Sequence, residues 1–160
     1  AGGKLLQTVG GHPMAAGFSI KTENLDVLAA RLNEVALTDI KDESLVKNVR
    51  VDCKLDFNQI NSEFYQELQK FHPFGYGNLE PTFETNGVTI EDARLVGKGS
   101  EHLKLTLSSE DLSFEAIAFR MGELYPKLKP DKTIGVVYSI EQDEWGNKKR
   151  LQLKLRHLNI

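Results

Sequence analysis

The segment "MGELYPKL", residues 121–128, decides how the second half of this 160-residue chain is predicted to fold. It forms a brief helical turn in a region whose other stretches alternate between apolar and polar residues, as strands do. Strands are predicted over residues 83–97, 102–109, 112–120, 133–142 and 149–159. Five strands with a helix between the third and the fourth is the element order of an OB-fold, a small Greek-key barrel. We therefore predict an α+β, mainly β fold with a five-stranded OB-fold barrel.

Upstream of the barrel, the pattern is that of a strand followed by a helix. "VGGHPMAAGFSI" (residues 9–20) ends like a strand, and "TENLDVLAARLNEVA" (22–36) places apolar residues at helical spacing. The stretch near residues 37–48 lacks an apolar face and is typical of a linker. We therefore predict two domains, a strand–helix unit in residues 1–40 and the barrel domain in residues 48–160.

Two elements precede the first barrel strand. "VRVDCKLDF" (residues 49–57) alternates like a strand and predicts that Cys53, the one cysteine, is buried. "NSEFYQELQKF" (61–71) predicts a short helix with Asn61 or Ser62 as its N-cap. A single cysteine excludes an intramolecular disulfide, and the four scattered histidines match no zinc spacing.

The overall composition is that of an ordinary soluble domain, with 40% hydrophobic residues and a net charge of −3. No apolar run approaches the roughly 20 residues of a membrane-spanning helix, and no signal-peptide pattern is present. We expect a cytoplasmic protein without a membrane partner. The acidic balance argues against indiscriminate nucleic-acid binding but leaves room for a local basic face.

Positive charge is concentrated on the predicted barrel strands and their last hairpin. The candidate residues for binding single-stranded nucleic acid are Arg94, Lys98, Lys104, Arg120, Lys148, Lys149, Arg150, Lys154 and Arg156. Such a cluster is typical of a surface that contacts phosphates. Alternating lysine and arginine also keep an edge hairpin soluble, so charge alone leaves both interpretations open.

"KFHPFGYGNLEPTF", residues 70–83, is rich in proline, glycine and aromatic residues. One interpretation is a rigid, aromatic-packed loop that leads into the barrel. The other is that Phe74 and Tyr76 stack on bases, as aromatic side chains do in proteins that bind single strands. The sequence does not show which rings face outward.

The glycine-rich stretch at residues 9–20 also has two interpretations. Gly10 and Gly11 fit a turn in which two backbones approach closely, and together with His12 they fit a cradle for a phosphate. No converging aspartates and histidines suggest a two-metal centre, and no nucleophilic triad or P-loop is visible. A separate hydrolase built on His12 or His72 finds no carboxylate or metal partner nearby in the sequence. The chain alone does not look like a complete enzyme.

Two motifs together carry a family resemblance. "GGHPMAAGF" (residues 10–18) matches the Gly-Gly-His-x-x-Ala-Ala-Gly signature of the domain associated with DHH phosphoesterases. Pro73 to Phe83 matches a more specific pattern, Pro-Phe-Gly-x-Gly-Asn-x-Glu-Pro-x-Phe. With the barrel pattern that follows, the whole chain resembles the C-terminal part of the RecJ family, bacterial single-strand-specific 5′→3′ DNA exonucleases of repair and recombination.

The resemblance implies a role for each part of the chain. Residues 1–40 would be the end of the DHH-associated domain, in which Gly10, Gly11 and His12 help to hold a substrate phosphate. The barrel would hold single-stranded DNA for an active site on another domain, which binds Mn²⁺ or Mg²⁺. This chain would then be inactive alone and carry no cofactor. Its partners would be single-stranded DNA, the rest of the parent chain and other repair proteins, although a protein-interaction scaffold without DNA contact is an alternative.

Overall fold

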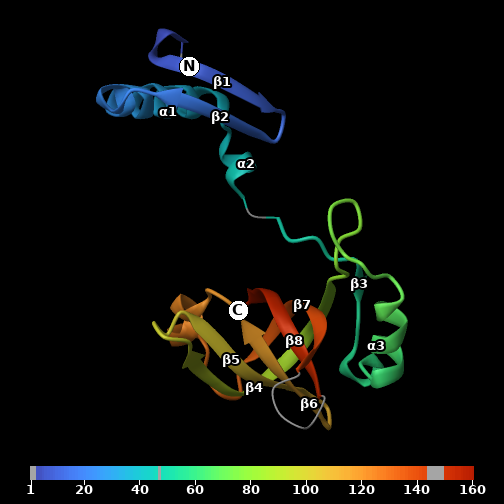
Figure 1. The fold of residues 1–160 in the computed structure, drawn as a ribbon. Helices are drawn as coiled ribbons and strands as arrows, with labels where there is room; N and C mark the ends of the chain where they lie inside the picture. The colour runs from blue at the N-terminus through green and yellow to red at the C-terminus, as the bar shows by residue number, and fades with distance from the viewer. Residues whose placement is uncertain (1–2, 47, 144–149) are drawn as a thin grey trace. The chain divides into compact units, whose positions relative to one another are not determined.

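The computed structural model describes residues 3–46, 48–143 and 150–160. The chain divides into two compact units, Ala1–Asn48 and Val49–Ile160. Figure 1 shows the elements of each unit.

The N-terminal unit is a β-hairpin followed by helices. β1 (Leu6–His12) pairs antiparallel with β2 (Ala15–Ile20), and the long helix α1 (Leu25–Asp39) follows. The shorter elements are the 3-10 helices η1 (Gly3–Leu5) and η2 (Thr22–Asn24) and the helix α2 (Asp42–Leu45). The predicted helix over 22–36 is thus present, but the glycine-rich stretch forms both strands of a hairpin instead of a turn before one strand.

The C-terminal unit is a closed barrel. Its strands are β4 (Phe83–Val96), β5 (His102–Ser109), β6 (Leu112–Ala118), β7 (Thr133–Asp143) and β8 (Arg150–Asn159). They pair in the order β4-β5-β6-β8-β7, and β4 also pairs with β7, which closes the ring. The β6–β8 pairing is parallel and the others in the ring are antiparallel. The 3-10 helix η4 (Gly122–Lys127) lies between β6 and β7 in the sequence, so the predicted OB-fold is confirmed.

The barrel core follows from the alternation in its strands. Leu103, Leu105 and Leu107 of β5 are at most 1% exposed, while the residues between them are only partly buried. Inside the barrel, the Thr85 hydroxyl donates to the Leu55 carbonyl at 2.5 Å and lies 2.8 Å from the Tyr138 hydroxyl. Because the Thr85 proton is committed to that carbonyl, the Tyr138 hydroxyl is the donor to Thr85. Burial raises the pKa of Tyr138 to about 12.

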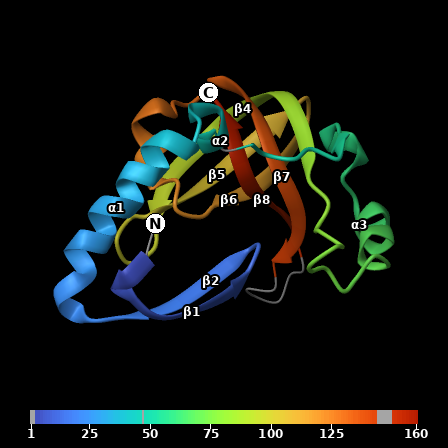
Figure 2. The same ribbon diagram turned by 90° about the horizontal axis from the view of Figure 1, so that it is seen from above.

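The segment before β4 attaches to the barrel at its edge. β3 (Cys53–Lys54) pairs in parallel with the start of β4, followed by the 3-10 helix η3 (Phe57–Gln59) and the helix α3 (Ser62–Gln69). Asn61 caps α3 by accepting a hydrogen bond from the Phe64 backbone N–H at 2.9 Å, one of the two caps predicted. In Figures 1 and 2, α3 lies beside the barrel, outside the ring of strands.

Cys53 is exposed, so its predicted burial is wrong. For two other residues of the same alternating pattern, Leu55 and Phe57, the structure does show burial. β3, however, has only β4 as a neighbour and lies at the margin of the core. Next to it, hydrogen bonds from the Thr82 backbone N–H and hydroxyl, together with Arg50, lower the pKa of Asp52 below its usual range.

Candidate nucleic-acid interface

A row of outward-facing residues crosses four strands of the barrel. Arg94 of β4 lies opposite Lys104 of β5, and Lys104 lies opposite Ile117 of β6. Ile117 in turn lies opposite Lys154 of β8. Residues directly opposite each other on paired strands share one face of the sheet. Three of the predicted cations therefore lie in this cross-strand row: Arg94 and Lys104 are neighbours, and Ile117 separates Lys104 from Lys154.

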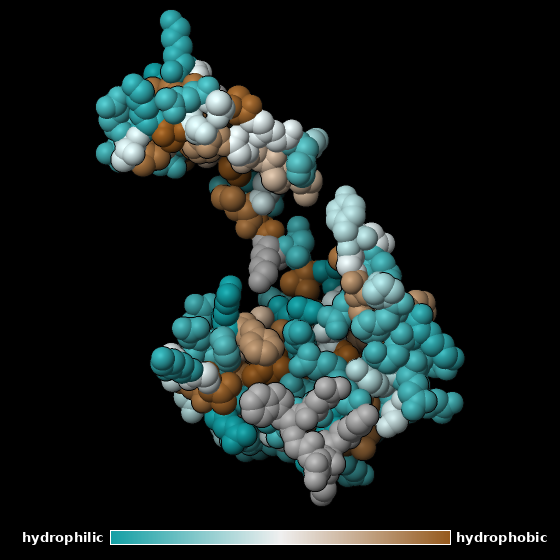
Figure 3. All heavy atoms as spheres, in the orientation of Figure 1, coloured by the Kyte–Doolittle hydropathy of each residue, from teal (hydrophilic) through white to brown (hydrophobic). Residues whose placement is uncertain are grey.

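An exposed aromatic side chain lies next to the cross-strand row. Phe119 follows β6 directly and is 49% exposed. Its ring centroid is 5.2 Å from that of His102, and the Lys154 ammonium lies 5.9 Å from it. In the space-filling view, a small apolar patch lies among hydrophilic side chains on the barrel face where β5 and β8 are seen (Figure 3). An exposed aromatic ring with a cation beside it is the kind of arrangement that holds unpaired bases and their phosphates.

His102 fixes the local geometry around Phe119. Its Nδ1 accepts a hydrogen bond from the Arg120 backbone N–H at 3.1 Å, so the neutral ring carries its proton on Nε2. A Cβ on Gly97 would lie only 3.2 Å from the His102 ring, and Gly97 has a φ of +92°. The β4–β5 loop is therefore packed directly against this histidine.

Phe119 is absent from the residues predicted from the sequence, although a signal for it exists. Glu115 and Ile117 face outward, and the same alternation continues to Phe119 beyond the end of the strand. An apolar residue on the outward register of a barrel strand is the feature that would have identified it.

Carboxylates pair with several of the predicted cations. Lys104 forms an ion pair with Glu115 at 3.1 Å, and Lys154 forms one with Glu141 at 3.4 Å. The Arg156 guanidinium contacts the Glu80 carboxylate and donates to the Ser139 hydroxyl at 3.3 Å. The sequence has no acid between Lys148 and Arg156, but the fold supplies Glu141 from β7 for Lys154 and Glu80 from the loop before β4 for Arg156.

The other predicted cations have different surroundings. Lys98 lies in the β4–β5 loop, and Arg120 follows β6 with a left-handed φ of +57°. Among the described residues, Arg94, Lys98 and Arg120 form no ion pair with a carboxylate. Lys148 and Lys149 lie outside the described residues.

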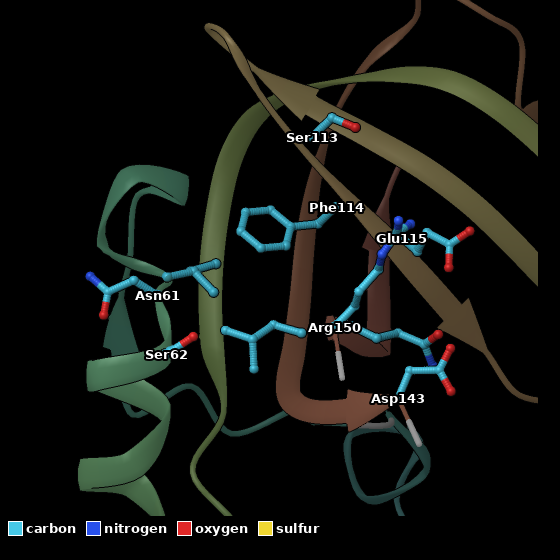
Figure 4. Close-up of a pocket in the computed structure, with 10 residues that line it drawn as sticks. Asn61, Ser62, Ser113, Phe114, Glu115, Asp143 and Arg150 are labelled. Atoms are coloured by element: carbon cyan, nitrogen blue, oxygen red, sulfur yellow. The ribbon is translucent and has the colours of Figure 1, made fainter. Parts of the chain in front are cut away.

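Arg150 lines a hollow of about 530 Å³ between α3 and strands β6 and β8. Figure 4 shows Asn61 and Ser62 at the start of α3 on one side of the hollow, with Phe114 and Glu115 of β6 across from them. The β6–β8 pairing is confined to Ala116–Ile117 and Leu153–Lys154, so the two strands separate here. Because Glu115 also pairs with Lys104, the hollow borders the cross-strand row.

The aromatic loop is held by its own hydrogen bonds. The Asn78 side-chain amide donates to the Phe71 carbonyl at 2.8 Å and to the Pro73 carbonyl at 2.9 Å. Gly75 and Asn78 exchange two backbone hydrogen bonds across a tight turn in which Gly77 has a φ of +81°. Tyr76 lies at the tip of this turn.

The two candidate stacking rings of this loop have opposite environments. Tyr76 is fully exposed. Phe74 is partly buried, with its ring centroid 4.1 Å from that of His72. Only Tyr76 therefore presents a free ring to solvent.

The three candidate phosphate-binding residues lie at the end of the N-terminal hairpin. A Cβ on Gly11 would lie 2.5 Å from the Ala15 carbonyl oxygen, so the hairpin itself requires glycine there. Gly10 faces Gly17 across the hairpin, and a Cβ on either would meet nothing within 4 Å. The His12 Nδ1 accepts a hydrogen bond from the Met14 backbone N–H at 3.2 Å, which leaves Nε2 as the donor of the neutral ring. The backbone at Gly10 and the His12 Nε2–H are therefore both accessible to a ligand.

The described residues offer no metal centre and no membrane-crossing helix. Nowhere in that part of the chain do three histidine, cysteine, aspartate or glutamate side chains gather so as to hold a metal ion. In the same residues, no helix has both the length and the apolar character that crossing a membrane requires.

Comparison with known proteins gives consistent matches. The single-stranded-DNA-specific exonuclease RecJ of Bacillus subtilis is 32% identical over 152 residues, which is 95% of this chain and 19% of that protein. The RecJ of Haemophilus influenzae is 30% identical over 93% of this chain and 26% of its own length. The crystal structure of Thermus thermophilus RecJ in complex with Mg²⁺ matches with a TM-score of 0.72 at 26% identity, covering 98% of this chain and 23% of that one. A second structure of that protein contains Mn²⁺.

The chain thus spans about a fifth to a quarter of the length of these relatives. The family described as the RecJ OB domain matches residues 51–157, which include β4, β5, β6 and β7 and most of β8. The sequence, the barrel topology and the family match agree, and the chain belongs to the RecJ OB domain family.

Proposed function

We propose that this chain holds single-stranded DNA for a metal-dependent exonuclease site on another part of its parent protein. The observation that carries the proposal is the exposed Phe119 ring between His102 and Lys154, next to the cross-strand row. The relatives named as single-stranded-DNA-specific exonucleases support it. The process we propose is DNA repair and recombination in the cytoplasm.

The surface suits an unpaired strand for physical reasons. A base can stack on the Phe119 ring only when it is not already stacked in a duplex, and every base has a face that can do so. The cations contact phosphates, which are the same in every sequence. The chain as a whole carries a charge of −3, so attraction is local and screened beyond about 8 Å at physiological salt. We therefore expect weak, salt-sensitive binding without sequence preference.

In the N-terminal unit, we propose that Gly10, Gly11 and His12 bind a phosphate of the strand near the active site. His12 Nε2 would donate to the phosphate, and the bare backbone at Gly10 would permit close approach. The described residues do not form a site for Mn²⁺ or Mg²⁺, so the metal would be held by the rest of the parent chain.

The rest of the parent chain is also the partner that we propose for the apolar surface of this unit. Leu28 is the one buried hydrophobic residue among the described residues of the unit, whereas Val9 is 70% and Phe18 is 50% exposed. A unit with so little core needs further chain packed against it to be stable.

The proposal is tested by fluorescence anisotropy of a labelled oligothymidine across a salt series. The test variant replaces Lys149, Arg150, Lys154 and Arg156 by alanine. The control replaces four lysines that belong neither to the cross-strand row nor to β8: Lys54 of β3, Lys70 after α3, Lys127 of η4 and Lys129 after η4. Each lost phosphate contact flattens the log–log salt slope by about 0.7 for a single strand. We expect a flatter slope for the test variant and an unchanged slope for the control. Equal slopes would move the contact surface away from β8.

One observation favours the alternative of a protein-interaction scaffold. Tyr76 is presented, fully exposed, by a loop that its own hydrogen bonds hold in place, and exposed tyrosines are frequent anchors of protein interfaces. Such binding depends little on salt. Failure of the chain to bind the oligonucleotide even at low salt would favour this alternative.

A further inference from the structure

We call the barrel surface that carries the cross-strand row, Phe119 and Arg156 the DNA face. Each of three cations on this face already has an anionic partner. Lys104, Lys154 and Arg156 contact the carboxylates of Glu115, Glu141 and Glu80. The partners come from different elements, since Glu115 is on β6, Glu141 is on β7 and Glu80 lies in the loop before β4. We call these three acids the carboxylate set.

These ion pairs are more enclosed than an ordinary surface pair. The Lys154 and Glu141 side chains are each 32% exposed, whereas Lys70 and Glu67 on α3 are 69% and 60% exposed. Glu141 is also held by the Gln152 side-chain amide, which donates to it at 3.1 Å. The carboxylate is therefore fixed in position beside the lysine.

The partners of Lys154 define a small site. Its ammonium lies 5.9 Å from the Phe119 ring centroid and 3.4 Å from a Glu141 oxygen. A phosphate next to a base stacked on Phe119 would be within reach of the Lys154 ammonium, which here is paired with Glu141. A carboxylate and a phosphate oxygen accept the same kind of hydrogen bond, so the two compete for one donor.

We propose that the carboxylate set competes with DNA phosphates for Lys104, Lys154 and Arg156, and thereby limits how tightly the barrel holds the strand. This inference rests on the proposed function and adds a regulatory role for three acids. When a phosphate binds, the ion pair between carboxylate and cation breaks and the cation pairs with the phosphate. When the phosphate dissociates, the original ion pair forms again. Each contact is therefore an exchange of partners instead of the capture of a free cation.

The exchange has a consequence for movement along the strand. A cation that always has a partner never pays the full desolvation and charge-separation cost of being left alone. Advancing the strand by one phosphate then replaces one ion pair by another of similar strength. A face built in this way holds a strand while still letting it slide, which suits an enzyme that consumes DNA from one end.

The test replaces the carboxylate set by isosteric amides in this 160-residue chain: Glu80→Gln, Glu115→Gln and Glu141→Gln, singly and together. In an amide variant no ion pair has to be broken before the phosphate binds, and the strength of one surface ion pair corresponds to up to about five-fold in affinity. We expect each single variant to bind labelled oligothymidine up to about five-fold tighter and the triple variant about ten-fold tighter or more. The slope of log affinity against log salt stays the same, because the same number of phosphates is contacted.

The matched control is Glu67→Gln, which frees Lys70 from an ion pair on α3, away from the DNA face. It changes the net charge equally and we expect less than about a two-fold effect on binding. If wild type binds and the triple and single variants bind no tighter than this control, the inference is overturned while the proposed function stands. If neither the wild type nor any variant binds at low salt, the proposed function fails and this inference fails with it. Thermal melting of each variant shows whether a change in affinity arises from a change in folding.

Discussion

Replacing Phe119 by alanine tests the stacking contact on the barrel directly. The ring is 49% exposed, and burial of the remainder reflects its contacts with the barrel surface, including His102. The substitution leaves the core residues of β6 unchanged, because Ala116 and Ala118 are fully buried and point to the opposite side of the strand from Phe119. We therefore expect binding to change far more than folding.

The expected size of the effect follows from the exposed part of the ring. Stacking of one base on an aromatic side chain is worth about 1–3 kcal/mol. Half of the Phe119 surface is already covered by protein, so the lower part of that range applies, about 1–2 kcal/mol, which is about a five- to thirty-fold loss of affinity. Because no charge is removed, the slope of log affinity against log salt stays the same.

The assay is anisotropy of labelled oligothymidine over a salt series, with Leu112→Ala as the control. Leu112 is 41% exposed and lies at the other end of β6. Its truncation therefore removes apolar surface away from Phe119 and Lys154. A loss of less than about two-fold for Phe119→Ala would refute the stacking contact. A flattened salt slope would show instead that the substitution acts by displacing Lys154.

Three further outcomes are expected. In the full-length parent enzyme, His12→Ala should lower turnover about ten-fold, the cost of one hydrogen bond to a charged group, without changing the melting temperature, since His12 is exposed; unfolding with normal kinetics of the surviving fraction would make the histidine structural. The 160-residue chain should cleave neither single- nor double-stranded DNA with Mn²⁺ or Mg²⁺, and nuclease activity that co-purifies with the chain would contradict this. Tyr138→Phe should cost about 0.5–1.5 kcal/mol near neutral pH through the lost hydrogen bond to Thr85. Because the folded pKa of Tyr138 is raised to about 12, its neutral form stabilises the wild type fully below about pH 10, and this contribution is lost as the pH rises toward 12. Urea denaturation should therefore show that the free energy of unfolding falls less between about pH 8 and pH 11 for Tyr138→Phe than for the wild type. Equal decreases would refute the raised pKa of Tyr138.

The barrel strands were predictable because their alternation is local. The predicted strand over 102–109 matches β5, and that over 133–142 differs from β7 by one residue. Most inward positions are filled by aliphatic side chains such as Leu103, Leu105 and Leu107, and burying them on one face sets the register strand by strand.

The charge balance of the DNA face was not predictable in the same way. Glu80 and Arg156 are separated by 76 positions in the sequence and meet only because β7 and β8 bring the barrel's end toward the loop before β4. A basic run in the sequence therefore overstates how many cations are free. The prediction for Cys53 failed for a related reason, since alternation shows which side of a strand faces inward but not where the core ends.

Closure of the barrel also determines where the chain has unpaired strand edges that could pair with another molecule. β4 pairs on both sides, so among the described barrel residues the unpaired edges lie at the two residues of β3 and where β6 and β8 separate beyond Ala116–Ile117 and Leu153–Lys154. The hairpin of β1 and β2, by contrast, is a two-stranded sheet with apolar side chains such as Val9 and Phe18 exposed. Free strand edges next to apolar surface are where chains add to one another edge to edge. During synthesis the hairpin is made before the barrel, so aggregation of this chain would start at its N-terminal unit, and residues 49–160 alone would be the part that stays dispersed at high concentration.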